Sequence, residues 1–202
     1  MSDLTIAIMA GGKSSRMGTD KAFVPLLGQP MIEHILARIS DLSQAQTIII
    51  TNQAEDYAPL GLPIFADVIP HKGALGGIYT ALHHSQTAYT LVIACDMPFI
   101  NAALLRYMID LRAEIGGPYD VIVPRDDQGH LEGLHAIYSQ RCREPIRNRL
   151  EADRLKVIGF YEDVRVRYVD PPEWKKIDPQ GLSFYNVNTP EELQAAQDIA
   201  DK

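Results

Sequence analysis

The sequence is poor in cysteine and has no long apolar segment. Cys95 and Cys142 are its two cysteines among 202 residues, and they lie too far apart to match a metal-binding spacing. We therefore expect neither a disulfide framework nor a zinc site, and both thiols are expected to be reduced, as in the cytoplasm. No stretch approaches the ~20 apolar residues that cross a bilayer, and the first residues lack the pattern of a secretory leader. These absences predict a soluble, cytoplasmic protein with no membrane partner.

Positive charge is also scarce. The chain has 19 Lys and Arg residues against 26 Asp and Glu residues, which gives a formal net charge of -7. A general nucleic-acid binder needs a basic face, so we expect no nucleic-acid partner. Polyanionic small molecules remain possible ligands, because one local cationic loop is enough to bind them.

Short apolar runs alternate with amphipathic segments along the chain. Runs rich in β-branched residues predict strands at residues 4–9, 47–51, 63–66, 89–94, 119–123, 134–138 and 164–169. Apolar residues at helical spacing predict helices over residues 30–39, 78–84, 104–115, 141–150 and 190–199, with Pro30 as the first helical residue. Residues 71–77 are expected to form a glycine-rich loop. Thr189 and Glu192 form a capping-box pattern at the start of the last helix.

Strands that alternate with helices at this spacing predict an α/β fold, a three-layer α/β/α sandwich with a mostly parallel sheet. A length of 202 residues fits a single domain. In such sheets ligands bind beyond the carboxyl ends of the strands. A glycine-rich loop, Asn52, Asp67 and Asp96 each follow a predicted strand, so we expect them to share one site.

The glycine-rich loop follows the first predicted strand. Residues 9–22 read Met-Ala-Gly-Gly-Lys-Ser-Ser-Arg-Met-Gly-Thr-Asp-Lys-Ala, which combines glycines with three cationic side chains. Glycines let a backbone approach an anion closely, and the loop therefore predicts phosphate binding, with an ordinary surface connection as the alternative. It is not a P-loop, because Ala7 stands where the first glycine is required. It is not a dinucleotide-binding motif either, because Lys13 replaces the second glycine.

Read as a unit, the loop resembles the signature of the small α/β nucleotidyltransferases, whose fold is Rossmann-like. The pattern is Gly11-Gly12-x-Ser14-x-Arg16-Met17-Gly18-x-Asp20-Lys21, and its Ala-Gly-Gly form is most similar to the molybdenum cofactor guanylyltransferases. Further matching pieces are Asn52, Asp67, residues 73–77, residues 95–98 and residues 186–192. Met9 stands where that family usually has leucine, and residues 125–135 match no family motif.

The resemblance implies a Mg²⁺-dependent transfer of GMP from GTP to the terminal phosphate of molybdenum-bound molybdopterin, with release of pyrophosphate. It implies a nucleotide-binding half near residues 1–100 and an acceptor-binding half near residues 101–202. Transient contact with proteins that deliver or receive the cofactor is a further expectation. The resemblance assigns GTP binding to Met9, Ala10, Gly11, Gly12, Lys21, Asn52, Asp67 and Asp96.

Three side chains are predicted to take part in catalysis, because nucleotidyl transfer requires charge to be neutralised around the reacting phosphate. The resemblance places Lys21 near the reacting phosphorus and Arg16 at the leaving pyrophosphate; the alternative is that either is a surface cation. Asp96 is the candidate Mg²⁺ ligand, since one carboxylate at a strand end suffices when the substrate supplies phosphate oxygens. A carboxylate that caps the next turn is the structural alternative for Asp96.

Other polar residues are candidates for recognising the two substrates. The carboxylate of Asp67 could accept both N1–H and N2–H₂ of guanine, and the family assigns the positions of Asp67 and Asn52 to GTP. Asn186 and Asn188 alternate on an extended segment and could face the pterin phosphate, although Asn188 could instead serve only the cap of the last helix. Five histidines form no metal-binding spacing and are expected to be structural or exposed: His71, His83, His84, His130 and His135.

Three other functions remain open from the sequence. A CTP-dependent enzyme acting on the same acceptor is the main rival, although its loop usually reads Ala-Ala-Gly. Sugar-phosphate nucleotidyltransferases share the loop but are generally longer. A catalytically silent nucleotide-binding regulator would not need Lys21 and Asp96 together.

Overall fold

A computed structural model describes residues 4–11, 20–42, 46–113 and 116–201. Within these residues, seven strands form one sheet in the order β5-β4-β1-β6-β8-β7-β9. The strands are β1 (Leu4–Met9), β4 (Gln46–Ile50), β5 (Ile64–Phe65), β6 (Tyr89–Ala94), β7 (Val121–Pro124), β8 (His135–Ser139) and β9 (Val166–Val169). Only β8 runs antiparallel to its neighbours in this sheet, so the predicted mostly parallel sheet is confirmed.

The strand β1, which lies inside the sheet between β4 and β6, shows why the sheet is buried on both faces. Leu4, Ile6 and Ile8 enter one apolar cluster, whereas Ala7 and Met9 enter the cluster on the opposite side. This alternation follows from the two-residue repeat of an extended chain. A strand with apolar residues on both faces needs helices on both faces, as in other parallel sheets.

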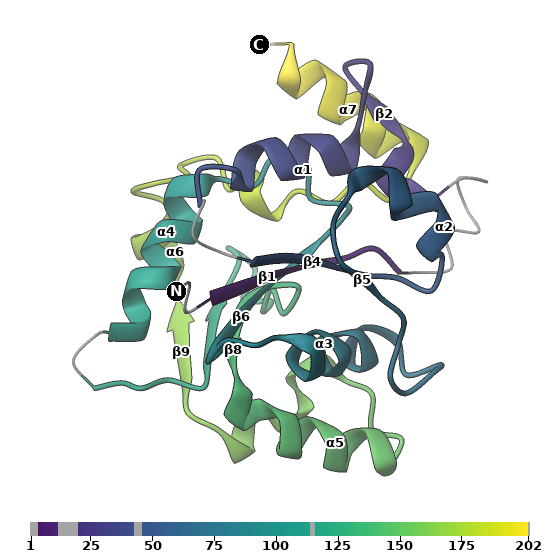
Figure 1. The fold of residues 1–202 in the computed structure, drawn as a ribbon. Coiled ribbons are helices and arrows are strands. Elements are labelled where there is room, and N and C mark those ends of the chain that lie inside the picture. The colour runs from purple at the N-terminus through teal and green to yellow at the C-terminus, as the bar shows by residue number, and fades with distance from the viewer. Residues whose placement is uncertain (1–3, 12–19, 43–45, 114–115, 202) are drawn as a thin grey trace.

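Helices cover both faces of the sheet, which confirms the predicted three-layer sandwich (Figure 1). Residues of α1 and α4 pack in the cluster on one face, and residues of α3 and α5 pack in the cluster on the other. The helices are α1 (Met31–Ile39), α2 (Ala54–Tyr57), α3 (Gly73–His84), α4 (Ala102–Asp110), α5 (Arg143–Glu151), α6 (Pro171–Trp174) and α7 (Pro190–Ala200). No helix in the described part of the chain is long and apolar enough to cross a bilayer.

The last helix, α7, begins as the sequence predicted. Thr189 and Glu192 form the capping box, in which Glu192 N donates to Thr189 Oγ1 at 3.2 Å and Thr189 N donates to Glu192 Oε2 at 3.0 Å. The segment just before α7 contacts the residues that follow β6, because Val187 N donates to the carbonyl oxygen of Asp96 at 2.9 Å. The end of the chain is thereby tied to the carboxyl end of β6.

Four predicted helix starts differ from the observed ones; those of α4 and α5 differ by two residues, and the other two have structural explanations. The helix expected from residue 78 begins five residues earlier, at Gly73, so most of the predicted glycine-rich loop is the first turn of α3. Glycine disfavours helices, but a Cβ added at Gly77 would overlap Met9 Cε. The other helix, α1, begins at Met31, because Pro30 pairs in a small hairpin of β2 (Pro25–Leu26) and β3 (Gln29–Pro30).

One buried polar residue stands out in this fold. His135 on β8 is fully buried, and its ring meets the Phe184 ring edge-on with centroids 5.4 Å apart. Within the described residues, neither ring nitrogen has a hydrogen-bond partner. Burial lowers the pKa of His135 to about 4, and the Asp178 carboxylate opposes this shift. The ring is therefore neutral in the folded protein at neutral pH.

This burial predicts a stability effect in mild acid. The unfolded chain binds a proton at His135 near pH 6.5, whereas the folded protein does so only near pH 4, so stability is lost as the pH falls between these values. A His135→Leu variant lacks this loss. Its free energy of unfolding relative to the wild type should rise by on the order of 1–3 kcal/mol from pH 7 to pH 4. Urea unfolding at the two pH values measures the change, and an unchanged difference would contradict the prediction.

Candidate active site

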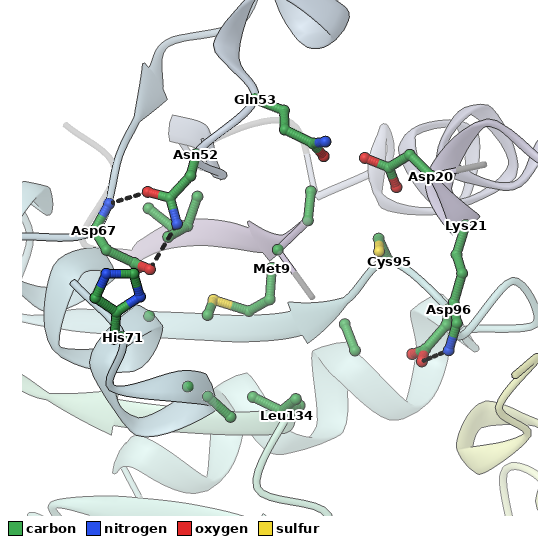
Figure 2. Close-up of a pocket in the computed structure, with 17 residues that line it drawn as sticks. Met9, Asp20, Lys21, Asn52, Gln53, Asp67, His71, Cys95, Asp96 and Leu134 are labelled. Carbon is green, nitrogen blue, oxygen red and sulfur yellow. Dashed lines mark hydrogen bonds and ion pairs between the residues drawn. The ribbon is translucent and has the colours of Figure 1, made fainter. Parts of the chain in front are cut away.

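A cavity of about 660 Å³ opens at the carboxyl ends of β1, β4 and β6. That volume lies within the ~300–1,000 Å³ typical of small-molecule sites. Figure 2 shows Asn52, Asp67 and His71 on one side of Met9, and Asp20, Lys21 and Asp96 on the other. The predicted site residues that line it are Met9, Ala10, Gly11, Lys21, Asn52, Asp67 and Asp96. Gly12 and Arg16 lie outside the described residues.

One end of the cavity is formed by a reciprocal pair. Asn52 Nδ2 donates to Asp67 Oδ2 at 2.9 Å, and Asp67 N donates back to Asn52 Oδ1 at 3.0 Å (Figure 2). Asn52 follows β4 and Asp67 follows β5, two adjacent parallel strands. The pair fixes both side chains, and an ionised carboxylate with about four lone-pair directions keeps capacity for ligand donors.

The start of α3 also lines the cavity, through Gly73, Ala74 and Gly77. The first N–H groups of a helix have no partner within the helix and form the positive end of its dipole. His71 lines the cavity just before this helix and has a φ of 63°. The sequence predicted a structural or exposed role for His71, because no spacing marks it as a site residue.

The opposite end of the cavity contains Lys21. This lysine begins a 3₁₀ turn, η1 (Lys21–Phe23), whose first N–H groups are capped by the preceding Asp20. Lys21 Nζ donates to Asn188 Oδ1 at 2.6 Å and lies 3.9 Å from Asp96 Oδ2. Its side chain is 21% exposed, so the ammonium group lies at the cavity wall instead of in open solvent.

Asp96 follows β6 and is mostly buried, with 22% of its side chain exposed. Burial raises the pKa of Asp96, and the nearby Lys21 ammonium partly offsets that rise. Asp96 Oδ1 is buried and has no hydrogen-bond partner within the described residues. A buried, unpartnered carboxylate oxygen is costly unless another group binds it, so this atom is suited to a ligand or a cation.

The donor set fits magnesium better than a metal held by protein alone. The part of the chain that the structure describes contains no group of three or more Cys, His, Asp or Glu side chains placed to hold a metal. Mg²⁺ is often bound by one or two carboxylates together with substrate phosphates and water. Asp96 would be the protein ligand in such an arrangement.

The two asparagines predicted to face one ligand have different partners. Asn188 Oδ1 accepts from Lys21, so this side chain contacts the lysine and does more than serve the cap of α7. Asn186 Nδ2 donates to the carbonyl oxygen of Phe184 at 3.1 Å. Neither residue lines the cavity. Their predicted role at the acceptor stays a prediction.

Comparison with known proteins gives the same picture for most of the chain. A family model described as the MobA-like NTP transferase domain matches residues 6–164. A probable molybdenum cofactor guanylyltransferase from Pelotomaculum thermopropionicum is 40% identical over 201 residues, which cover 100% of this chain and 95% of that protein. The molybdenum cofactor guanylyltransferase from Desulfosudis oleivorans is 33% identical, and the match covers 98% of this chain and 96% of that protein.

A solved structure extends the similarity to the fold. The molybdopterin-guanine dinucleotide biosynthesis protein A from Archaeoglobus fulgidus superposes with a TM-score of 0.83 at 28% sequence identity. The superposition covers 98% of each chain. The shared arrangement therefore includes both the strands that end at the cavity and the C-terminal segment next to Asp96.

Proposed function

The chain belongs to the MobA-like NTP transferase family, and we propose that it transfers GMP from GTP to the terminal phosphate of molybdenum-bound molybdopterin. The products are the guanine dinucleotide form of the cofactor and pyrophosphate. One observation carries the proposal. A single cavity has the Asn52–Asp67 pair at one end and Lys21 with Asp96 at the other. Relatives that match almost the whole chain are named for this activity.

The Asn52–Asp67 end is suited to a guanine base. Guanine presents N1–H and N2–H₂ as adjacent donors, and one carboxylate can accept both. Asn52 holds the Asp67 carboxylate in place through a bond of 2.9 Å, so little side-chain freedom is lost when a base binds. Adenine presents no such pair of donors, and Asp67 therefore favours guanine.

The Lys21 end is suited to the triphosphate. In the reaction an oxygen of the acceptor phosphate forms a bond to the α-phosphorus of GTP. The bond from that phosphorus to the oxygen bridging to the β-phosphate breaks, and pyrophosphate leaves with the electron pair. Lys21 places a positive charge beside the reacting phosphate. Ala10 and Gly11 line the same cavity. We assign Gly12 to GTP and Arg16 to the leaving pyrophosphate from the family pattern.

A Mg²⁺ ion bound at Asp96 would add positive charge at the phosphates and help to orient them. Asp96 holds one carboxylate oxygen free of protein hydrogen bonds within the described residues, as this role requires. The acceptor would then approach from the side of residues 101–202, where Asn188 accepts a hydrogen bond from Lys21 and Val187, between Asn186 and Asn188, donates one to the backbone of Asp96. A cytoplasmic location and transient contacts with proteins that carry the cofactor accord with these substrates.

A panel of substrates tests the proposed function. The protein is incubated with Mg²⁺, each of the four nucleoside triphosphates, and either molybdenum-loaded molybdopterin or a set of sugar phosphates. Pyrophosphate release is expected only with GTP and the pterin, because Asp67 selects guanine and the reaction needs the acceptor phosphate. Release with CTP would indicate a cytidylyltransferase, and release with a sugar phosphate would indicate a different acceptor. Nucleotide binding without any release would indicate a regulator.

The metal role of Asp96 predicts the effect of an isosteric change. An Asp96→Asn variant keeps the shape of the side chain but removes its charge, and kcat/KM should fall by roughly 10²–10³-fold. The Mg²⁺ concentration needed for half-maximal rate should rise. Initial rates over a Mg²⁺ titration measure both quantities.

A surface carboxylate provides the control for Asp96→Asn. Asp127 is 57% exposed and pairs with Lys175 away from the cavity lining, so Asp127→Asn should keep the wild-type rate. Circular dichroism checks that the Asp96→Asn variant is folded. A folded Asp96→Asn protein with a wild-type rate and Mg²⁺ requirement would refute the assignment.

Base selection by Asp67 predicts a change in the preference for GTP over ITP, which lacks the N2 amine. The wild-type enzyme should prefer GTP, because Asp67 can accept two hydrogen bonds from guanine but one from hypoxanthine. In Asp67→Asn the ratio of kcat/KM for the two nucleotides should fall by about tenfold. Steady-state rates with each nucleotide give the ratio. If the ratio stays at its wild-type value, Asp67 does not select the base.

A further inference from the structure

A buried tyrosine contacts both flanks of the signature loop. Tyr57 ends α2 and is fully buried. Its hydroxyl donates a hydrogen bond of 2.7 Å to Asp20 Oδ2. The same hydroxyl lies 3.4 Å from the carbonyl oxygen of Ala10, near the long limit for a hydrogen bond. Ala10 and Asp20 lie before and after residues 12–19 in the chain, so a single hydroxyl from another element meets the backbone on one flank and a carboxylate on the other.

Asp20 transmits this contact to the turn that carries Lys21. Asp20 Oδ1 accepts from Ala22 N at 3.1 Å, and the carbonyl oxygen of Asp20 accepts from Phe23 N at 3.1 Å. The carboxylate is therefore the N-cap of η1 while its other oxygen is held by Tyr57. Because Lys21 is the first residue of this turn, the orientation of the turn sets the direction of its side chain.

Tyr57 is well suited to hold a fixed position. Its ring packs against Phe23, the last residue of the same turn, with ring centroids 4.8 Å apart. Burial and the hydrogen bond to Asp20 both raise the pKa of Tyr57 far above its usual value. The hydroxyl is therefore protonated at neutral pH and donates to the Asp20 carboxylate.

We propose that Tyr57 is a positioning residue of the active site: its hydroxyl holds Asp20, and Asp20 fixes the turn that aims Lys21 at the reacting phosphate. The inference rests on the proposed guanylyl transfer, because it takes Lys21 as the group beside the α-phosphate. α2 follows Asn52, which lies at the base end of the cavity, and Gln53, which also lines the cavity. The short helix thus connects the base end to the lysine through Tyr57.

A Tyr57→Phe variant removes the hydroxyl and keeps the ring on Phe23. Lys21 acts most strongly in the transition state, so kcat for guanylyl transfer should fall by about tenfold while KM for GTP stays within about twofold. The Tm should fall by about 2–6 °C, because the Asp20 carboxylate loses a donor. Steady-state kinetics and thermal unfolding give these values. A kcat within about twofold of wild type in a folded Tyr57→Phe protein would overturn the proposal, as would a change confined to KM.

Tyr107 offers a matched control. Its hydroxyl donates to Glu173 Oε2 at 2.7 Å, the same length of hydroxyl–carboxylate bond, and Tyr107 does not line the cavity. Tyr107→Phe should lower the Tm by a similar amount without changing kcat. If Tyr107→Phe lowers kcat as much as Tyr57→Phe does, the loss reflects general destabilisation, and the proposal is wrong.

A double-mutant cycle tests whether Tyr57 acts through Lys21. Lys21→Met alone should lower kcat strongly. Adding Tyr57→Phe to Lys21→Met should lower kcat by less than about twofold more, because the group that Tyr57 positions is already gone. A full second loss of about tenfold in the double variant would show that the tyrosine acts by another route.

Two further outcomes separate this inference from the proposed function. If the wild-type protein transfers no guanylyl group, both are overturned together. If the wild type is active and Tyr57→Phe keeps its kcat, only the inference about Tyr57 fails. Should Tyr57→Phe not fold, Asp20→Ala removes the acceptor instead. It should show the same loss of kcat, and an unchanged kcat would overturn the proposal.

Discussion

The parallel alignment of β4, β1 and β6 is the constraint on which the site depends. Met9 lies opposite Ile50 and Ala94 in the register of these strands, so all three end at the same level. The residues that follow the strands are therefore brought to one edge without any long-range side-chain contact. Asn52 and Asp96 are separated in sequence by α2 and the whole β5–α3–β6 unit, and they line the same cavity for this reason.

Close backbone packing then shapes the cavity between its two polar ends. Gly77 in α3 lies so near Met9 that a Cβ there would overlap the methionine methyl group. The helix can therefore approach the end of β1, and its first turn becomes part of the cavity wall. This arrangement brings the positive end of the α3 dipole to the cavity, where an anionic ligand gains from it.

Sequence patterns predicted the elements that are governed by local rules. The strand over residues 89–94 and the cap of α7 were predicted at their observed positions, because apolar runs and capping boxes depend on neighbouring residues. The start of α3 was missed because glycine disfavours helices, whereas in the fold Gly76 and Gly77 lie close to Lys72 and Met9, where a larger side chain would meet them. The bond from Lys21 to Asn188 joins residues 167 positions apart, and the bond from Tyr57 to Asp20 joins two elements. Spacing patterns in the sequence cannot predict contacts between residues this far apart.

The charges at the lysine end are incompletely matched within the described residues. Lys21 makes its short hydrogen bond to the neutral Asn188 and lies 3.9 Å from Asp96, while one buried oxygen of Asp96 has no hydrogen bond. Burial raises the pKa of Asp96, which means that the ionised carboxylate is less stable here than in water. A protein optimised for stability alone would bring the two charges together or replace them. Lys21 instead forms a long ion pair of 3.9 Å with Asp96 and a short hydrogen bond to Asn188, and Asp96 Oδ1 is left without a partner within the described residues, an arrangement that a bound ligand would complete.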